Sequence, residues 1–434
     1  MKGCPFKQQM LFGRRNGAPS TGQHSRLTAC KVSHYSDTKG YRSCLVLLGA
    51  TIKPTDQTEI RQARPDDWPA IASFIDDCYG PEATFKNGPR WRWQFIDTPY
   101  SVDPTDVPVW IAVADGKVLG QIALQPARMF LEGEACSAGW IVDVMIRPEQ
   151  RGSGLGHRIH DAMVASGRTL VTLTMAPATR RIADKAGAVT LGPVLQMVRP
   201  RSLSGSTIST VLSRSLENRT GLTRTVGGVF LASRVGPALL GATISAGTAA
   251  LRLGSRRREP ASLLVEAVET LDLAAVADLF ELSSSQCPAL FDRGREFMAW
   301  RTLEAPDLTY RWLEARSQGM LRGLATTRLP IDAELPIATL VDVLAPPDDV
   351  AAIDALVGAA VDHLAPQSEA IIAGASHPAD VSILRRHGFI AVRQHRPTVV
   401  TADSALRDRI ARLANGWRMT KIDHDWDQVH PAAH

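Results

Sequence analysis

Between residues 58 and 200, some segments have continuous apolar runs typical of strands, and others have apolar residues at helical spacing. Apolar runs over 109–113 and 118–124 flank a central Asp115-Gly116 pair, a spacing that predicts a β-hairpin with an Asp-Gly turn. Ile71, Phe74 and Ile75 recur at helical spacing after Pro65, which predicts an amphipathic helix. The other predicted elements are strands over 60–63, 141–146 and 170–175, helices over 154–166 and 179–185, and a last strand after Gly187. This order, β-α-β-β-β-α-β-α-β, predicts a mixed sheet with helices on both faces.

Three short segments of the first half recur in the same order in the second half. The pairs are Trp93–Pro99 with Trp300–Pro306, Val142-Asp143-Val144 with Val341-Asp342-Val343, and 181–188 with 382–389. We interpret them as two copies of one plan, which gives a chain of α/β (α+β) class. The alternative is two independent domains that share these signals.

Composition divides the chain into four parts. We predict a disordered basic leader over 1–57, a first domain over 58–200, a linker rich in Gly, Ser and Arg over 201–260, and a second domain over 261–434. The leader has no apolar run long enough for a signal peptide. It is either a transit-like peptide or an upstream extension wrongly included in the reading frame, and we favour the second.

The apolar segment 225–251 of the linker has the length of a bilayer span. Its internal Arg234 and its several glycines disfavour insertion. We therefore expect a segment that packs between domains. A peripheral membrane contact is the alternative, since Arg256, Arg257 and Arg258 would suit an anionic lipid surface.

Charge and cysteine content narrow the class of protein. The net charge of +5 is concentrated in residues 1–50, where eight Lys and Arg face only Asp37, so the remainder carries a net charge of −2. A near-neutral body offers no basic face to a phosphate backbone, and we expect no nucleic-acid partner. The six cysteines form neither C-x-x-C pairs nor a disulfide framework. We therefore expect a cytoplasmic protein without a metal site.

A glycine-rich turn lies between the predicted strand that ends before Pro148 and the predicted helix over 154–166. Its residues are Arg151, Gly152, Ser153, Gly154, Leu155 and Gly156. Free backbone N–H groups at a helix N-terminus bind phosphate, and glycines let the ligand approach them closely. The spacing differs from the dinucleotide-binding Gly-x-Gly-x-x-Gly, and no Gly-Lys-Ser/Thr follows. The turn therefore predicts a pyrophosphate site of another kind.

The strand ending Ile146-Arg147-Pro148 followed by Arg151-Gly152-Ser153-Gly154-Leu155-Gly156 resembles the signature of the GNAT acetyltransferases. The resemblance covers 60–200 and implies two GNAT-like domains, each a mixed, mostly antiparallel sheet flanked by helices. It implies acetyl-CoA as co-substrate, bound by Val144, Ile146 and the residues 151–156. A backbone N–H there would stabilise the oxyanion while a primary amine attacks directly in a ternary complex.

The attacking amine must be neutral, so a carboxylate is the expected proton acceptor. The resemblance makes Asp143 the candidate general base, with Glu132 and Glu134 as lesser candidates. Asp342 repeats Asp143 in a half without a glycine-rich turn, which favours an architectural role for both. The tyrosine that many GNAT enzymes use as general acid is replaced by Ala183, and by Leu384 in the second half. His157 and His160 we interpret as packing or solvent-facing residues.

The second half has Pro346-Pro347-Asp348-Asp349 in place of the glycine-rich turn, and these acids would repel a pyrophosphate. We therefore interpret it as a degenerate copy. Its closing segment 417–425 mixes Trp417 with acids and could line a polar pocket. Similar endings occur in tandem GNAT proteins, which makes an amino sugar a candidate acceptor. The leading hypothesis is an N-acetyltransferase for a small-molecule amine or amino sugar; the alternative is a non-catalytic sensor or scaffold that binds acyl-CoA.

Overall fold

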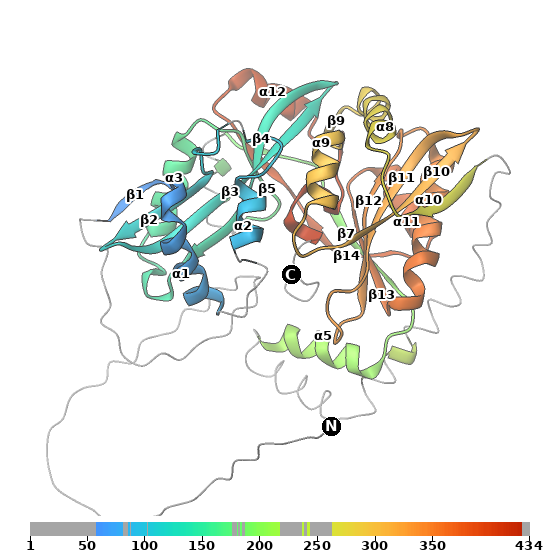
Figure 1. Ribbon diagram of the computed structural model, residues 1–434, viewed down its shortest axis with the longest axis horizontal. Coiled ribbons are helices and arrows are strands. Elements are labelled where there is room, and N and C mark those ends of the chain that lie inside the picture. The colour runs from blue at the N-terminus through green and yellow to red at the C-terminus, as the bar shows by residue number, and fades with distance from the viewer. Residues whose placement is uncertain are drawn as a thin grey trace, which may run out of the picture. The chain divides into compact units, whose positions relative to one another are not determined.

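The computed structural model describes residues 58–80, 86, 88–101, 103–175, 180, 183–184, 187–217, 237, 241–243 and 263–427 (Figure 1). Two mixed, mostly antiparallel sheets form the framework, each with helices packed against it. This arrangement confirms the predicted α/β (α+β) class. The predicted leader 1–57 lies outside the described residues, as does the segment 225–251 except at 237 and 241–243.

The first sheet is built mainly from the first half of the chain. Its strands, in spatial order, are β1 (Glu59–Gln62), β2 (Val109–Ala114), β3 (Lys117–Leu131), β4 (Glu134–Ile146), β5 (Leu170–Thr172), β15 (Thr398–Val400) and β6 (Val189–Thr190). Along this order only β4 and β5 are parallel. Two short strands extend the sheet at the far end of β3: β9 (Ala289–Phe291) pairs with β3, and β16 (Trp417–Arg418) pairs with β9.

The second sheet follows the same plan. Its strands, in spatial order, are β14 (Ile390–His395), β7 (Val194–Pro200), β13 (Ala370–Ala375), β12 (Ile337–Leu344), β11 (Met320–Arg328), β10 (Tyr310–Ser317) and β8 (Leu264–Val268). The single parallel step lies between β12 and β13. Along its main order of seven strands, each sheet therefore has one parallel pair of neighbours, at corresponding places.

The helices cover both faces of each sheet through their apolar sides. The α-helices are α1 (Trp68–Tyr79), α2 (Gly88–Phe95), α3 (Leu155–Ala165), α5 (Gly205–Glu217), α8 (Leu273–Ser285), α9 (Arg295–Met298), α10 (Val350–Leu364), α11 (Pro378–Arg386) and α12 (Ser404–Arg412). The shorter turns are η1 (Pro65–Asp67), η3 (Pro148–Gln150), the π-helical η4 (Ala299–Leu303), η5 (Ala365–Gln367), η6 (Lys421–Asp423) and η7 (Asp425–Asp427). On the first sheet, α3 packs on one face and α1, α2 and α12 on the other. On the second, α10 and α11 pack opposite α8 and α9.

The two halves exchange strands. β7 leaves the first half and inserts between β13 and β14 of the second sheet (Figure 1), while β15 leaves the second half and inserts between β5 and β6 of the first. Both guest strands are antiparallel to both neighbours. The predicted division at residues 200 and 261 stays a prediction, but the sheets themselves share strands across it.

Local predictions agree with the structure where local pattern decides them. The hairpin β2–β3 turns at Asp115 and Gly116, whose φ angles of 50° and 71° are those a type I′ turn requires. Residues 155–165 are helical, as predicted for 154–166. The strand predicted over 170–175 is shorter and ends at Thr172. Of the helix predicted over 179–185, the described positions 180, 183 and 184 are helical. Within the described ranges, no helix has the length and hydropathy to cross a membrane.

Candidate functional site

The candidate site begins where β4 and β5 separate. Their parallel pairing is limited to Gly139 with Leu170 and Trp140 with Val171, although β4 continues to Ile146. The splayed part of β4 also carries a bulge, because its register with β3 shifts between Gln121 and Ala123. The bulge leaves a stretch of β4 whose edge is not covered by β5.

Asp143 lies at this bulge in the left-handed region, with φ of 49°. The next residue, Val144, is 49% exposed although it lies within β4, two residues before the strand ends. Ile146 is half-buried, and its side chain packs with the cluster under α3. Of the three β4 residues predicted to contribute to the site, the structure thus buries Asp143 and exposes Val144.

The glycine-rich turn connects β4 to α3 through η3. Gly152 and Gly154 have φ angles of 80° and 83°, conformations that other residues adopt only with strain. A Cβ atom built on either would meet nothing within 4 Å. These glycines are therefore required by the backbone path and not by packing, as expected where a ligand approaches the main chain.

The N-terminus of α3 has no side-chain cap. Gly154 is the N-cap residue and has no side chain to accept a hydrogen bond, while the Ser153 hydroxyl donates to the Gln150 carbonyl at 2.7 Å. The backbone N–H of Leu155 reaches the Ser153 oxygen only at 3.4 Å. The helix dipole and its weakly satisfied N–H groups make this end of α3 an anion-binding position.

The predicted cofactor residues gather around this turn. Arg151, Gly152, Ser153 and Gly154 are exposed, the Leu155 side chain is buried, and Gly156 is half-buried in the first turn of α3. Arg147 fixes the start of the turn, because its Nε donates to the Val118 carbonyl at 2.7 Å and its Nη2 lies 2.8 Å from Asp77 Oδ2. The approach to the helix N-terminus is therefore held in place by side chains outside the turn.

Asp143, the candidate general base, is 2% exposed and forms an ion pair with Lys86. No sequence pattern pointed to Lys86, which precedes α2. Glu132 and Glu134 lie at the turn of the β3–β4 hairpin, where both contact Arg409 of α12. Since they are at the opposite end of β4 from the glycine-rich turn, Asp143 remains the favoured candidate of the three.

Gln121 of β3 lies beside this ion pair in the sheet, opposite Met145 of β4. Its side chain is 0% exposed, and neither Oε1 nor Nε2 has a hydrogen-bond partner in the described part of the chain. A buried amide without partners is costly. A polar residue inside the apolar run 118–124 was the signal from which sequence reasoning could have found this position.

His157 is exposed on α3, as expected for a solvent-facing residue. His160 is largely buried, and this burial lowers the pKa of its imidazole. The imidazole of His160 lies 3.9 Å from the carboxylate of Asp161, its neighbour on α3 and not a residue of the turn. Among the described residues, no group of three or more His, Cys, Asp or Glu side chains could hold a metal ion.

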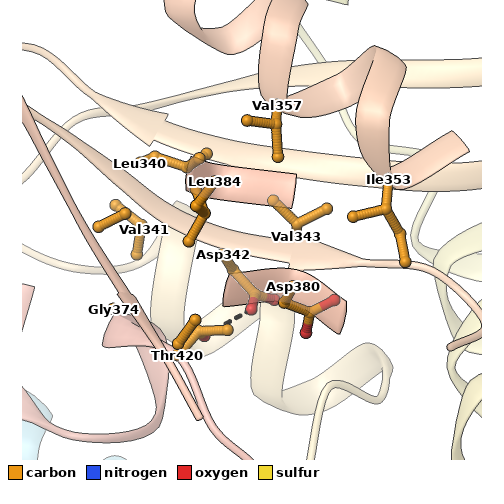
Figure 2. Close-up of a pocket in the computed structure, with 12 residues that line it drawn as sticks. Leu340, Val341, Asp342, Val343, Ile353, Val357, Gly374, Asp380, Leu384 and Thr420 are labelled. Carbon is orange, nitrogen blue, oxygen red and sulfur yellow. Dashed lines mark hydrogen bonds between the residues drawn. The ribbon is translucent and has the colours of Figure 1, made fainter. Parts of the chain in front are cut away.

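In the second sheet the corresponding parallel strands also separate, but the space between them is filled. Its parallel pair β12–β13 separates after Leu340, and Asp342 follows at a shift in register with β11. The slot between the strands contains only about 20 Å³ of free space, room for about one water molecule (Figure 2). Thr420 of the closing segment reaches into it and donates to Asp342 Oδ1 at 2.6 Å.

The helix that follows β12 is also capped, unlike α3. Asp349 is the N-cap residue of α10, and its Oδ1 accepts a hydrogen bond from the Ala352 N–H at 3.1 Å. Its other oxygen accepts from Arg322 Nε at 3.0 Å. The acid therefore occupies the position where α3 has a free glycine, which explains in physical terms why this turn is unsuited to a phosphate.

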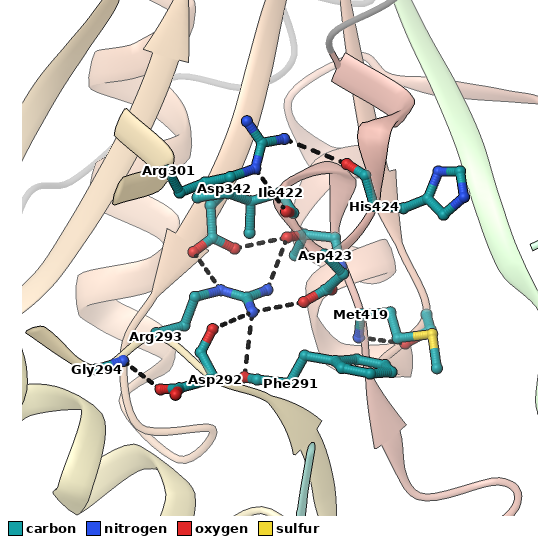
Figure 3. Close-up of polar contacts among 12 residues, drawn as sticks. Phe291, Asp292, Arg293, Gly294, Arg301, Asp342, Met419, Ile422, Asp423 and His424 are labelled. Carbon is teal, nitrogen blue, oxygen red and sulfur yellow. Dashed lines mark hydrogen bonds and ion pairs between the residues drawn. The ribbon is translucent and has the colours of Figure 1, made fainter. Parts of the chain in front are cut away.

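Buried ion pairs hold the closing segment against the second sheet. Arg293 lies 3.0 Å from Asp342 Oδ2 and 2.5 Å from Asp423 Oδ1 (Figure 3). Burial lowers the pKa of Arg293, but the two carboxylates outweigh burial and raise it. Burial raises the pKa of Asp423, and Arg293 opposes this. Asp342 is thus an architectural residue in its half, as the sequence suggested.

Comparison with known proteins decides the family. The model of the acetyltransferase (GNAT) domain matches residues 59–187, which include the bulged strand, the glycine-rich turn and α3. Residues 59–187 of this chain are therefore a GNAT acetyltransferase domain. This confirms the family inferred from residues 146–156. None of the curated proteins compared with the chain matches its sequence.

Solved structures similar to this GNAT protein share its fold at low identity. A GCN5-related N-acetyltransferase from Anabaena variabilis is 14% identical with a TM-score of 0.50, over 79% of this chain and 72% of that one. The N-myristoyltransferase of Saccharomyces cerevisiae, solved with myristoyl-CoA and inhibitors, is 10% identical with a TM-score of 0.51, over 81% of this chain and 82% of that one. A tandem GNAT protein from the clavulanic acid biosynthesis pathway is 13% identical with a TM-score of 0.45, over 80% and 99%. The chain therefore has the GNAT acyltransferase fold, while these neighbours leave the acyl group and the acceptor open.

Proposed function

We propose that this GNAT protein is an acetyl-CoA-dependent N-acyltransferase that acetylates a primary amine of a small molecule or amino sugar. The observation that carries the proposal is the contrast between the two helix N-termini. α3 begins at Gly154 without a side-chain cap, after two glycines with positive φ, whereas α10 is capped by Asp349. Only the first offers its N–H groups to a pyrophosphate.

The splayed strand supports the second part of the site. β4 has an edge that β5 does not cover beyond Trp140, and Val144 is exposed there. Such an edge can pair with the amide groups of a pantetheine arm, as a strand would pair with the sheet. Acetyl-CoA would supply the acetyl group as a thioester, which needs no covalent intermediate on the protein.

Around this edge the chain's own residues have separate tasks. The backbone of the bulge at Asp143 would donate to the developing oxyanion. The Asp143 carboxylate would accept the proton of the attacking amine, directly or through water, while Lys86 holds it in place. Gln121, with its buried and unpartnered amide, would hydrogen-bond to the acceptor.

The missing tyrosine favours a release of CoA without a dedicated acid. Ala183 is buried and has no proton to give. A thiol is an acceptable leaving group near neutral pH, so transfer remains feasible. The absence of the tyrosine also motivates the second candidate, a sensor or scaffold that binds acyl-CoA without turning it over.

Gly156→Glu and Gly156→Gln form the matched pair of variants for testing the cofactor site. A Cβ at Gly156 meets only Ile146, at 3.7 Å, so both variants have room to fold. Glutamate in the first turn suits the helix dipole but would repel a pyrophosphate, whereas glutamine has nearly the same size without the charge. Isothermal titration of the full chain with acetyl-CoA should give saturable binding that Gly156→Glu loses and that Gly156→Gln weakens less.

Release of CoA thiol in the presence of candidate amines then separates the two functions. Amine-dependent release supports the transferase, whereas binding without release by any amine supports the sensor. Equal binding to the chain and to Gly156→Glu, or no binding to either, would contradict both. A parallel titration with myristoyl-CoA tests whether acetyl is the transferred group. Tighter binding of myristoyl-CoA would assign a long-chain acyl donor instead of acetyl-CoA.

A further inference from the structure

Arg328, the last residue of β11, is a buried guanidinium with little compensation. It is 1% exposed, and its Nε and Nη1 have no hydrogen-bond partner among the described residues. Its Nη2 donates to the Thr339 hydroxyl, at 3.3 Å. An arginine does not lose its proton in a protein, so this charge cannot be relieved by titration.

Lys421 places a second buried cation nearby. It opens η6, is 0% exposed, and its Nζ has no hydrogen-bond partner in the part of the chain that the structure describes. The ammonium lies 3.9 Å from the centre of the Trp426 ring. Burial lowers the pKa of Lys421 to about 7, and the charge of Arg328 acts in the same direction. The two cations are therefore close enough to repel each other.

The carboxylate of Asp427, whose charge acts on both cations, is already paired with other residues. Asp427 forms an ion pair with Arg301 through Oδ1 and accepts the Tyr310 hydroxyl through Oδ2 at 2.7 Å. Arg90, whose charge also acts on Arg328, forms an ion pair with Asp307. Buried charges are retained when they are paired, and the pairs around this place leave Arg328 and Lys421 without an anion of their own.

The two cations adjoin the proposed acyl site through the closing segment. Trp426 carries Lys421 on its face, and His424, two residues earlier, packs edge-on against Trp140 with ring centroids 5.0 Å apart. Trp140 is the last residue of β4 that pairs with β5. The closing segment therefore contacts β4 at the place where β5 separates from it.

We propose that Arg328 and Lys421 bind a carboxylate or phosphate group carried by the amine acceptor. This inference rests on the proposed function for the identity of the ligand, but not for the existence of the anion site. A guanidinium with two unpartnered nitrogens and an ammonium with three N–H groups are the kind of groups that recognise such anions. The acceptor class is then an amino acid or a phosphorylated amino sugar, rather than an uncharged amine.

The anion site is tested first with inorganic phosphate alone. Melting temperatures of the full chain are measured in phosphate and in sodium chloride at equal ionic strength, without acyl-CoA. Phosphate should stabilise the protein and should lose roughly tenfold or more in affinity in Arg328→Met and in Lys421→Met, the effect of a lost charge-assisted hydrogen bond. Arg328→Lys should keep part of the effect. Arg322→Met, which removes an arginine that is 45% exposed, should keep all of it.

Removing an unpaired buried charge should also change the melting temperature in a known direction. Without phosphate, Arg328→Met should melt at the same temperature as the parent or higher, because the apolar side chain relieves an uncompensated charge. Lower melting of this variant in chloride would show that Arg328 has a partner. That result, or a phosphate effect that the buried variants leave unchanged, would overturn the anion site.

The acceptor is tested in a second experiment with acyl-CoA present. Amines that carry a carboxylate or phosphate are compared with their amide or alcohol analogues. The parent should show a lower KM for the anionic series, and Arg328→Met should abolish the difference with a smaller change in kcat. Transfer without preference would refute the acceptor's part in the proposal. No transfer to any amine, together with specific phosphate binding, would refute the proposed function and leave the anion site intact.

Discussion

Trp93 and Trp300 form reciprocal hydrogen bonds, each from its indole to the main chain of the other. The indole Nε1 of Trp93 donates to the Trp300 carbonyl at 2.9 Å, and the indole of Trp300 donates to the Trp93 carbonyl at 3.0 Å. Their rings stack with centroids 4.6 Å apart and an angle of 16°. The two residues are 207 positions apart and were matched as counterparts from their spacing to a following proline. Such mutual contact is what two equivalent units related by a local twofold axis produce.

The tryptophan pair predicts coupled effects on stability. Trp93→Phe and Trp300→Phe each keep an aromatic ring but leave one buried carbonyl without its donor, which should cost about 1–3 kcal/mol. The double variant should cost less than the sum of the two, by about 0.5–1.5 kcal/mol. Urea unfolding of the four proteins measures this coupling. Strict additivity would show that the contacts do not depend on each other.

The ion pair between Asp143 and Lys86 distinguishes a catalytic from an architectural acid. If Asp143 is the general base, Asp143→Asn should lower kcat by about 10²–10⁴-fold. Lys86→Met should chiefly destabilise, by about 3–5 kcal/mol, because it leaves a buried carboxylate unpaired. The double variant should recover much of that stability but none of the kcat. An Asp143→Asn protein with parental kcat per folded molecule would assign Asp143 the role that Asp342 has beside Arg293.

Lys421 predicts a stability that rises with pH. An unfolded lysine has a pKa near 10.5, whereas burial lowers the pKa of Lys421 to about 7. Between these values the unfolded state binds more protons, so raising the pH favours folding, on the order of 1 kcal/mol per unit. The charged groups around the ammonium are Asp425 and Asp427 of η7 and Arg328 of β11. The imidazole of His395 in β14 also faces it, but burial lowers the pKa of His395 to about 4, so this group is neutral in the range considered.

Denaturant midpoints at pH 7.5, 8.5 and 9.5 measure this dependence. They should increase in the parent and in Lys117→Met, which removes an exposed lysine from a hairpin turn. In Lys421→Met the increase should be smaller, since the group that titrates is gone. Parallel curves for the parent and Lys421→Met would show that Lys421 does not titrate in this range.

Loss of the Asp349 cap is predicted to destabilise the start of α10. Asp349→Ala removes the cap of the Ala352 N–H and the ion pair with Arg322, and should destabilise by about 0.5–2 kcal/mol. Asp348→Ala, at the exposed neighbouring position, should change stability by less than about 0.5 kcal/mol. Melting temperatures of the two variants check the difference. Equal effects would mean that the acids act through overall charge and not through capping.

Much of the first half could be predicted because its signals are local. The Asp115-Gly116 turn needs positive φ angles, the apolar face of α1 needs helical spacing, and Gly152 and Gly154 are required by a turn that only glycine forms easily. These features depend on neighbours within a few residues. The family model matches 59–187, the stretch in which such signals are densest.

The site could be predicted in outline but not in its electrostatics. Sequence placed the phosphate-binding turn and Asp143, whereas Lys86 comes from a segment 57 residues away and meets Asp143 only through folding. Gln121 was visible as a polar residue in an apolar run, but its lack of partners was not. Arg328 and Lys421 looked like ordinary charged residues, since burial of a charge leaves no local pattern.

The sequence by itself determined the fold class, the glycine-rich turn before α3 and the capping acid before α10, because glycine, proline and acid residues act on the backbone next to them. The tertiary structure decided which strands are neighbours. β7 (Val194–Pro200) and β15 (Thr398–Val400) are short strands, and nothing in their own residues assigns either of them to one sheet. Their exchange, and the closing segment that fills the second slot, depend on contacts between residues some 200 positions apart, where only packing and ion pairing of the whole chain select the partner.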